Sequence, residues 1–474
     1  MNEELKKEII SKTFGSYYAM VEIAKGLDLT SQLHRTYGER NGNILLGTAI
    51  SRIVHVGPPT QTADVFSESF LPELLNFTDD TTWEPLESGI LFLEMSYAKR
   101  DDLFKNLSEG DSSIVFELTS FLTPFKLLDL NKAGLKYGII DLPLRTVYLA
   151  TNMQDGRPFA FFYRSPREPS ISSMRFIDKE VGKYGKTTTE FFSDGSCITE
   201  EGMVAMGRQD LGYTIRIGPE SKIYKRLLSE SVRPLHDSTQ THVQNGMVYR
   251  VYETEGITND GRSRAIILLN EKRRNDELLS FYEKIGIFER TVPEMDWRDD
   301  IEDTVSMEQE FEDIARMFSF KPGKDGKVEV TRKRKAITAE ENKFGKSIFI
   351  TNTSRTWQEI VRMKQVRDIY EHDLTVFKTD LERGARYFPS AKSAESSFIS
   401  DFVGIILKSR LQSLIESSPF AGRVEVEGIL SELNKLKVSK IDGEWMVNTI
   451  PFSQMAIFSA LGVDIPYRVF NAGM

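Results

Sequence analysis

The spacing of apolar residues divides the chain into segments that favour helices and segments that favour strands. Residues 1–108 carry apolar positions at helical spacing, for example in YYAMVEIAKGLDLTSQLHRTYG and NILLGTAISRIVHVG, and no segment there alternates as a half-buried strand does. We therefore predict an N-terminal helical domain over residues 1–108.

After Gly110 the pattern changes to that of a mixed sheet with helices packed against it. SSIVFELTSF is predicted as a buried strand, LRTVYLATNMQDGRPFAFFYRS as a hairpin that turns at Asp155 and Gly156, and TTTEFFSDG and YTIRIG as further strands. ISSMRFIDKEVGKYG and EEGMVAMGRQD are predicted helices. We predict that the first part of an α/β core occupies residues 109–221.

Short strand candidates alternate with charged loops between residues 222 and 346. These candidates are GMVYRVYE, SRAIILLN and KVEVTRK. We predict a β-rich insertion there, because strand and helix patterns resume at SIFITNTS. Residues 347–474 are predicted to complete the core and to add C-terminal helices.

Composition narrows the class of protein. The single cysteine, Cys197, excludes a disulfide framework, and the five histidines show no zinc-ligand spacing. A metal site would therefore consist of carboxylates, which favours Mg²⁺ or Mn²⁺. No apolar run is long enough to span a bilayer, and the N-terminus lacks a signal-peptide core. We expect a soluble, cytoplasmic protein with no membrane partner.

The charge is unevenly distributed along the chain. The net charge of −9 argues against nucleic-acid binding by the whole surface, but basic residues gather locally. Lys272, Arg273 and Arg274 form one basic group. A second group, predicted to contact DNA, consists of Arg332, Lys333, Arg334 and Lys335.

One predicted helix, MKQVRDIYEHDLTVFKTDLERG, carries an unusual set of charges. Lys364, Arg367, Glu371 and Lys378 follow one another at spacings of three, four and seven residues. At about 100° per residue, all four fall within roughly 60° of one another. Two interpretations remain open: a solvated face with i,i+4 ion pairs, or a wall that binds a metal and a polyanion together.

Three carboxylates occupy positions at which they could bind a metal ion. Glu117 lies within the first predicted strand, where a carboxylate is costly unless it is paired or bound to metal. Asp194 ends a later strand, and Glu371 lies on the charged helix. Together they can hold two divalent cations, which clamp the attacking and leaving oxygens of a phosphodiester. The alternatives are an ordinary Asp-Gly turn at Asp194 and an edge-strand Glu117 with its side chain in water.

These motifs together resemble those of a DDE insertion-sequence transposase, in the group marked by a Tyr-x2-Arg-x3-Glu-x6-Lys signature. Arg367, Glu371 and Lys378 match three of its four positions, with Lys364 where Tyr is usual. FFSDGSCITEEGMVAMGRQDLGYTIRIG resembles the second-Asp block, and IFITNTSR resembles the Thr-Asn element before the third block. VFELTSF resembles the first-Asp block, with Glu117 in place of Asp.

The resemblance implies a fold, an activity and partners. The fold would be a ribonuclease-H-like mixed sheet with flanking helices, interrupted by the β-rich insertion and preceded by the helical domain. The activity would be metal-dependent cleavage and strand transfer at the ends of a DNA element. The partners would be double-stranded DNA, both element ends and target, and a second copy of the chain when DNA is bound. The protein would be associated with the nucleoid of a prokaryote.

The resemblance also assigns roles to residues. Two Mg²⁺ or Mn²⁺ ions would be held by the catalytic residues Glu117, Asp194 and Glu371. DNA phosphates would be bound by Lys364, Arg367 and Lys378.

Glu117 leaves alternatives open. Its side chain is one methylene longer than that of Asp and would displace the carboxylate by about an ångström, which can cost about 10²-fold in rate. Asp129 or Asp141 could serve instead, although neither lies in the matching strand. The alternative function is a catalytically decayed, transposase-derived protein that binds DNA without cutting it. A third hypothesis is a ribonuclease-H-like nuclease with no role in transposition.

Overall fold

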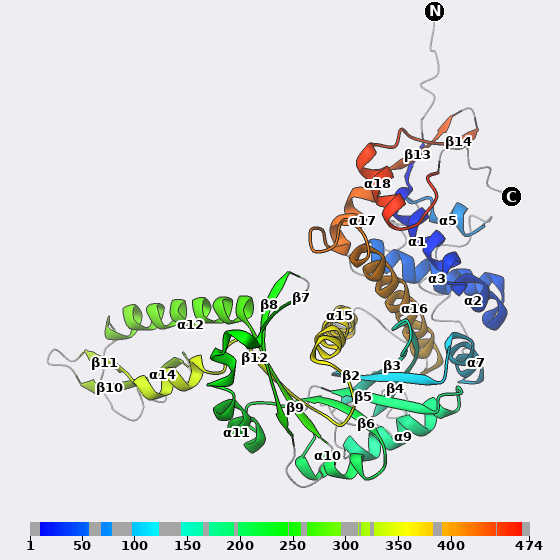
Figure 1. Cartoon of the computed structure of the whole chain (residues 1–474). Helices are drawn as coiled ribbons and strands as arrows, with labels where there is room; N and C mark the ends of the chain where they lie inside the picture. The colour runs from blue at the N-terminus through cyan, green and yellow to red at the C-terminus, as the bar shows by residue number, and fades with distance from the viewer. Residues whose placement is uncertain are drawn as a thin grey trace, which may run out of the picture. The chain divides into compact units, whose positions relative to one another are not determined.

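The chain folds into two compact units, seen in a computed structural model (Figure 1). Unit 1 consists of Met1–Phe192 and Met363–Met474, and unit 2 consists of Ser193–Arg362. The structure describes residues 10–55, 68–77, 97–122, 144–164, 170–193, 198–244, 246–256, 263–294, 311, 314–322, 327–382, 391–441 and 443–466.

Four strands of unit 1 lie in the order β4-β3-β2-β5. The strand β2 (Ser112–Leu122) pairs antiparallel with β3 (Leu144–Asn152) and parallel with β5 (Thr188–Ser193). The strand β4 (Pro158–Arg164) pairs antiparallel with β3. The sheet is therefore mixed, and the α/β class predicted from the sequence is confirmed.

Helices cover both faces of these strands. Phe161 of β4 packs edge-on against Phe104 of α7 (Tyr97–Leu107) and Phe402 of α16 (Ala391–Glu416), at 5.2 and 5.3 Å between ring centroids. Arg164 of β4 lies over the ring of Phe176 from α9 (Ser170–Gly182). Because strand side chains alternate between faces, α9 lies on the opposite face from α7 and α16, as Figure 1 shows.

The first and last parts of the chain pack together within unit 1. The strand β1 (Ser11–Thr13) pairs antiparallel with β13 (Lys437–Ile441), which also pairs with β14 (Glu444–Val447). The sequence indicated only helices in this N-terminal region. A three-residue strand carries no pattern of its own and is defined by its partner.

The remaining helices described in unit 1 follow the predicted apolar spacing, except for the four-residue α5, which was not predicted. They are α1 (Gly15–Gly26), α2 (Leu29–Tyr37), α3 (Glu39–Val54), α5 (Leu71–Leu74), α17 (Val426–Asn434) and α18 (Phe452–Ala460). A further helix, α15 (Trp357–Glu382), begins in unit 2 and continues into unit 1 at Met363.

Five strands of unit 2 form an antiparallel array in the order β6-β12-β9-β8-β7. Four of them coincide with predicted strands. Their bounds are β6 (Gly212–Arg216), β7 (Thr241–Gln244), β8 (Met247–Glu255), β9 (Arg264–Asn270) and β12 (Lys346–Thr351).

The region predicted as a β-rich insertion contains helices as well as strands. The longest is α12 (Glu271–Thr291), which begins where the side chain of Asn270 accepts a hydrogen bond from the backbone N–H of Arg273. Phe281, Ile285 and Phe288 form its buried stripe. This stripe packs against the hairpin of β10 (Phe318–Pro322) and β11 (Val328–Arg332).

Unit 2 also contains the shorter helices α10 (Glu200–Gly207), α11 (Lys222–Glu230) and α14 (Arg334–Glu341). The helical pattern of α12 is blurred because its apolar residues Leu279 and Ile287 lie on the exposed face. The domain boundaries at residues 108, 221 and 346 stay predictions.

Candidate functional site

Glu117 lies near the middle of β2, half-buried beside the neighbouring strand. The hydroxyl of Tyr148 on β3 donates a hydrogen bond to Oε1 of Glu117 at 3.2 Å. The pairing of β2 with β3 shifts register between Glu117 and Ser120. A bulge of this kind interrupts the hydrogen-bond ladder locally.

Arg367 of α15 connects Glu117 with Glu371. Its Nε donates to the backbone carbonyl oxygen of Glu117 at 3.0 Å, and its Nη2 lies 3.3 Å from Oε2 of Glu371. Only 13% of the Arg367 side chain is exposed. The carbonyl at the bulge thus gains a charged donor, and the strand and the helix meet at one guanidinium.

Tyr370 fixes α15 on the sheet of unit 1. Its ring packs edge-on against Phe116, with 5.7 Å between centroids, and both residues are buried. Its hydroxyl donates to the carbonyl oxygen of Gly156 in the β3–β4 turn at 3.0 Å. Arg367 and Glu371 flank Tyr370 in sequence, so the same packing sets their position.

Two of the three cations predicted to line one wall of α15 are described with their side chains, and both form ion pairs within the helix. Lys364 pairs with Asp368, four residues further along α15, and Arg367 pairs with Glu371 at the same spacing. These are the i,i+4 ion pairs of the alternative interpretation. Lys378 lies in the last part of α15, where side chains are outside the described set.

Whether the three carboxylates converge stays a prediction. The register places Phe116 of β2 beside Phe192 of β5, so the strand that leads to Asp194 runs next to the strand of Glu117. Asp194, together with Asp129 and Asp141, lies outside the described residues. Among the residues that the structure does describe, no group of three or more Asp, Glu, His or Cys side chains is placed to hold a metal ion.

The donor chemistry of the described pair suits a hard cation. Carboxylate oxygens are the ligands that Mg²⁺ and Mn²⁺ prefer, and Arg367 contacts the carboxylate of Glu371 and the backbone carbonyl oxygen of Glu117. Glu371 already pairs with Arg367, and Glu117 already accepts from Tyr148. Metal binding at these residues would therefore have to compete with both contacts.

The basic run of unit 2 spans the end of β11 and the start of α14. Arg332 forms a two-pronged ion pair with Glu289 of α12, at 2.6 and 2.7 Å. The pKa of Glu289 is lowered by this hydrogen bond. Lys333, Arg334 and Lys335 are exposed. All four predicted DNA contacts are therefore on the surface, and the charge of Arg332 is balanced by Glu289.

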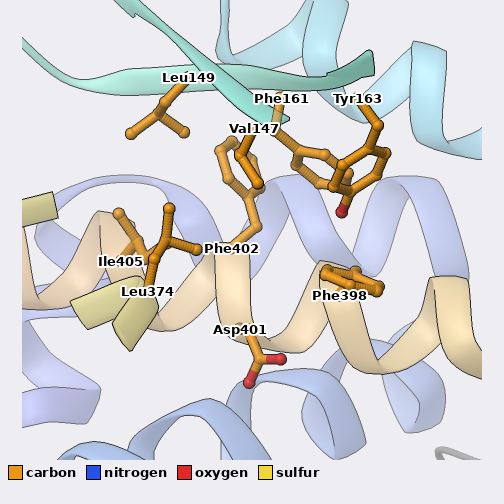
Figure 2. A pocket seen from close by; sticks show the side chains of 9 residues that line it. All are labelled: Val147, Leu149, Phe161, Tyr163, Leu374, Phe398, Asp401, Phe402 and Ile405. Carbon is orange, nitrogen blue, oxygen red and sulfur yellow. The ribbon is translucent and has the colours of Figure 1, made fainter. Parts of the chain in front are cut away.

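An apolar crevice in unit 1 lies close to α15, and its lining is mostly aliphatic and aromatic. It lies between β3, β4, α15 and α16, and Figure 2 shows rings of Phe161, Tyr163 and Phe398 along it. Its one charged lining residue, Asp401, points away from these rings and pairs with Arg52 of α3. We interpret the crevice as a packing feature.

Sequence reasoning missed a second, polar hollow. It lies in unit 2 among β6, α11, α12 and β12, and its lining includes Arg216, Arg273 and Lys346. The basic group at residues 272–274 was the only signal for it, because the other residues are far apart in the sequence.

Comparisons with known proteins give no family for this chain: no protein-family model matches it, and no curated protein matches it either. None of the helices in the described residues is both long and apolar enough to cross a membrane.

Proposed function

We propose that this chain is a DDE-type DNA transposase that cleaves and joins DNA at the ends of a mobile element. The observation that carries the proposal is the contact of Arg367 with the backbone carbonyl oxygen of Glu117 and with the carboxylate of Glu371, two residues that are 254 positions apart in the sequence. The signature positions Arg367, Glu371 and Lys378 support it, and so does the mixed sheet in which β2 and β5 run parallel.

Glu117, Asp194 and Glu371 are the proposed ligands of two Mg²⁺ or Mn²⁺ ions. Two such ions, when bound, supply activation of the attacking hydroxyl and stabilisation of the leaving oxygen of the phosphodiester. Arg367 would then balance negative charge beside the scissile phosphate, where its planar guanidinium suits a two-pronged phosphate contact. The remainder of the proposed ribonuclease-H-like core positions these groups.

The proposed partner is double-stranded DNA. Lys333, Arg334 and Lys335 form an exposed cationic surface on unit 2 that can contact the backbone. We further propose that the helical part of residues 1–108 recognises the element ends, that the chain acts as a homodimer on DNA, and that it is nucleoid-associated.

A DNA-binding protein without cleavage activity is the second candidate. It is favoured by one observation: the carboxylate at the first-Asp position is the longer Glu117, and it accepts from Tyr148. A displacement of about 1 Å at a catalytic group can lower the rate by about 10²-fold.

Nicking of supercoiled plasmid by the purified full chain, in Mg²⁺ and in Mn²⁺, tests the proposal. Glu371→Gln keeps the shape of the side chain but removes a metal ligand, and we expect it to reduce nicking by at least about 100-fold. Asp368→Asn is the matched control, because Asp368 is an exposed carboxylate of the same helix turn, and its ion pairs in the described part of the chain are with cations of α15. Its nicking rate should stay within about twofold of wild type.

The outcomes separate the candidates. Nicking that is lost in Glu371→Gln and retained in Asp368→Asn supports the transposase. An inactive wild type with an active Glu117→Asp variant supports the decayed protein. Nicking that survives Glu371→Gln contradicts the assignment of Glu371.

A further inference from the structure

The long helix α12 carries a second stripe of residues, on the side away from its buried one. Its buried residues pack against the hairpin of β10 and β11, and Figure 1 shows that hairpin and α14 on one side of the helix. On the other side, five residues follow one another at alternating spacings of three and four: Asp276, Leu279, Glu283, Gly286 and Arg290. At about 100° per residue, these five fall within roughly 80° of one another. We call them the α12 stripe, and their spacing is the one by which one helix packs along another.

Large apolar side chains are exposed along the middle of this stripe. Leu279 is 64% exposed, and Ile287, which follows Gly286, is 50% exposed. Both lie well inside a helix of 21 residues, so they are not at a fraying end. Transfer of such side chains from water to an apolar contact is favourable. The fold of a single chain leaves that gain unrealised on this side of α12.

Gly286 has no explanation within the fold of unit 2. Its φ is not positive, and a Cβ there would meet nothing within 4 Å. Glycine inside a helix is less favourable than alanine, so this position lowers helix stability without a local need for it. Glycine is typical of places where another group approaches the backbone closely. The gap at Gly286 can therefore receive a side chain from outside this chain.

The two ends of the stripe carry opposite charges that the fold does not use. Asp276 and Arg290 are both exposed, and within the described residues neither side chain has an ion pair or a hydrogen bond. They are 14 positions apart, which is about 21 Å along a helix, so they cannot pair with each other. By contrast, Glu277 pairs with Arg273 and Glu289 with Arg332.

We propose that α12 packs antiparallel against α12 of a second copy of this chain, about a twofold axis at Glu283. In a twofold interface one surface serves both chains, so each contact occurs twice. Position 283 is midway between positions 276 and 290, so Asp276 lies opposite Arg290 of the partner subunit. The same register places Leu279 opposite Ile287 of the partner subunit and over the gap at its Gly286.

This arrangement is a weak dimer that forms without DNA. A single helix face offers less than the roughly 1,200 Å² of a standard interface, and we expect a dissociation constant on the order of 10 µM. The two copies of Glu283 face each other at the axis and weaken the pairing by repulsion. The inference does not rest on the proposed transposase activity, because it uses none of the residues assigned to that activity.

Sedimentation velocity of the full chain, without DNA and from about 1 to about 200 µM, tests the proposal. The sedimentation coefficient of wild type should rise with concentration. Leu279→Gln should weaken the dimer at least about tenfold, because it removes the central apolar contact. It should fold with an unchanged melting temperature, since Leu279 is largely exposed. Lys284→Gln is the matched control: Lys284 is an exposed residue of α12 that lies about 140° from Leu279 around the helix, and its variant should dimerise as wild type does.

A charge exchange tests the antiparallel register. Asp276→Arg alone places arginine opposite arginine, and Arg290→Asp alone places aspartate opposite aspartate, so each variant should be monomeric. An equimolar mixture restores opposite charges at both ends of the stripe, and it should dimerise about as well as wild type. A mixture that stays monomeric overturns the proposed register.

Glu283→Gln provides a variant with the opposite effect. Loss of two facing negative charges at the axis should strengthen the dimer several-fold, whereas a residue remote from the interface would change nothing. The proposal is overturned by a wild type that stays monomeric at about 200 µM, or by a dimer that is as strong in Leu279→Gln as in wild type. Neither result depends on whether the chain cleaves DNA.

Discussion

At the scale of residues, Arg367 is the group on which the proposed site depends. It serves two acceptors from different elements: a backbone carbonyl at a β-bulge and the carboxylate of Glu371. The i,i+4 pair with Glu371 follows from the sequence alone, since helix geometry brings these positions together. The contact with the backbone of Glu117 could not be predicted from the sequence, because no residue pattern shows that a bulge frees a carbonyl group.

The side chain of Glu117 shows a second limit of prediction from the sequence. Its strand is predictable from the apolar pattern, but the face from which its side chain leaves β2 depends on which side α15 packs. Phe116 faces Tyr370 of α15, and successive side chains of a strand leave on opposite faces. The side chain of Glu117 therefore leaves β2 on the face opposite to Phe116 and accepts from Tyr148, so the metal site proposed for Glu117 and Glu371 requires this side chain to turn towards α15.

We predict that Tyr148→Phe lowers the free energy of unfolding by about 1 kcal/mol, because a buried hydroxyl would no longer donate to the Glu117 carboxylate. Chemical denaturation measures the change. Tyr249→Phe is the control, since among the described residues the hydroxyl of that buried tyrosine donates to the thioether of Met247 at 3.7 Å, a weak acceptor. Equal losses in the two variants would show that the contact with Glu117 contributes no specific stability.

At the scale of elements, the apolar pattern identified most strands and helices of the described residues. The hairpin of β3 and β4 turns at Gly156 with φ of +71°, as the Asp-Gly pair indicates. The pattern did not reveal β1, whose three residues are defined by β13, or α12, whose exposed face mixes charged residues with Leu279 and Ile287. Both depend on partners that are remote in the sequence.

Gly345, between α14 and β12, provides a test of local packing. Its φ is +72°, and a Cβ there would lie 2.6 Å from Cβ of Arg274 and 2.7 Å from the carbonyl oxygen of Asn270. We predict that Gly345→Ala destabilises unit 2 by about 3 kcal/mol, from left-handed strain and crowding together. The change should appear as a lower melting temperature by calorimetry.

Gly246 is the control for this prediction. It also has φ of +72°, but a Cβ there would meet nothing within 4 Å. Gly246→Ala should cost only the strain, about 1 kcal/mol. A loss in Gly345→Ala no larger than that in Gly246→Ala would contradict the crowding argument.

At the scale of the whole molecule, the two ends of the chain share one core in unit 1. Phe70 packs edge-on against both Phe14 and Trp445, at 5.7 and 5.1 Å between ring centroids. Tyr18 of α1 contacts Phe458 of α18 at 6.0 Å. Apolar faces of the N-terminal helices are therefore covered by C-terminal elements, which the apolar spacing of residues 1–108 does not disclose.

We predict that a fragment of residues 1–108 does not fold by itself, because removal of the C-terminal elements exposes Phe14, Tyr18 and Phe70 to water. Circular dichroism should show little helix and no cooperative melting. Addition of a fragment of residues 391–474 should restore both. Cooperative melting of the first fragment alone would instead establish an independent N-terminal domain.

The pairing of β1 with β13 also sets a time for folding in the cell. Lys12 is paired with Val438, so 426 further residues must be synthesised after Lys12 before its partner is complete. At about 5–20 residues per second, synthesis of that length takes roughly 20–85 s. During this interval the N-terminal helices are already synthesised, but the C-terminal elements that cover their apolar faces are not. A nascent chain of this kind would depend on chaperones until translation ends, and its yield would respond to the speed of translation.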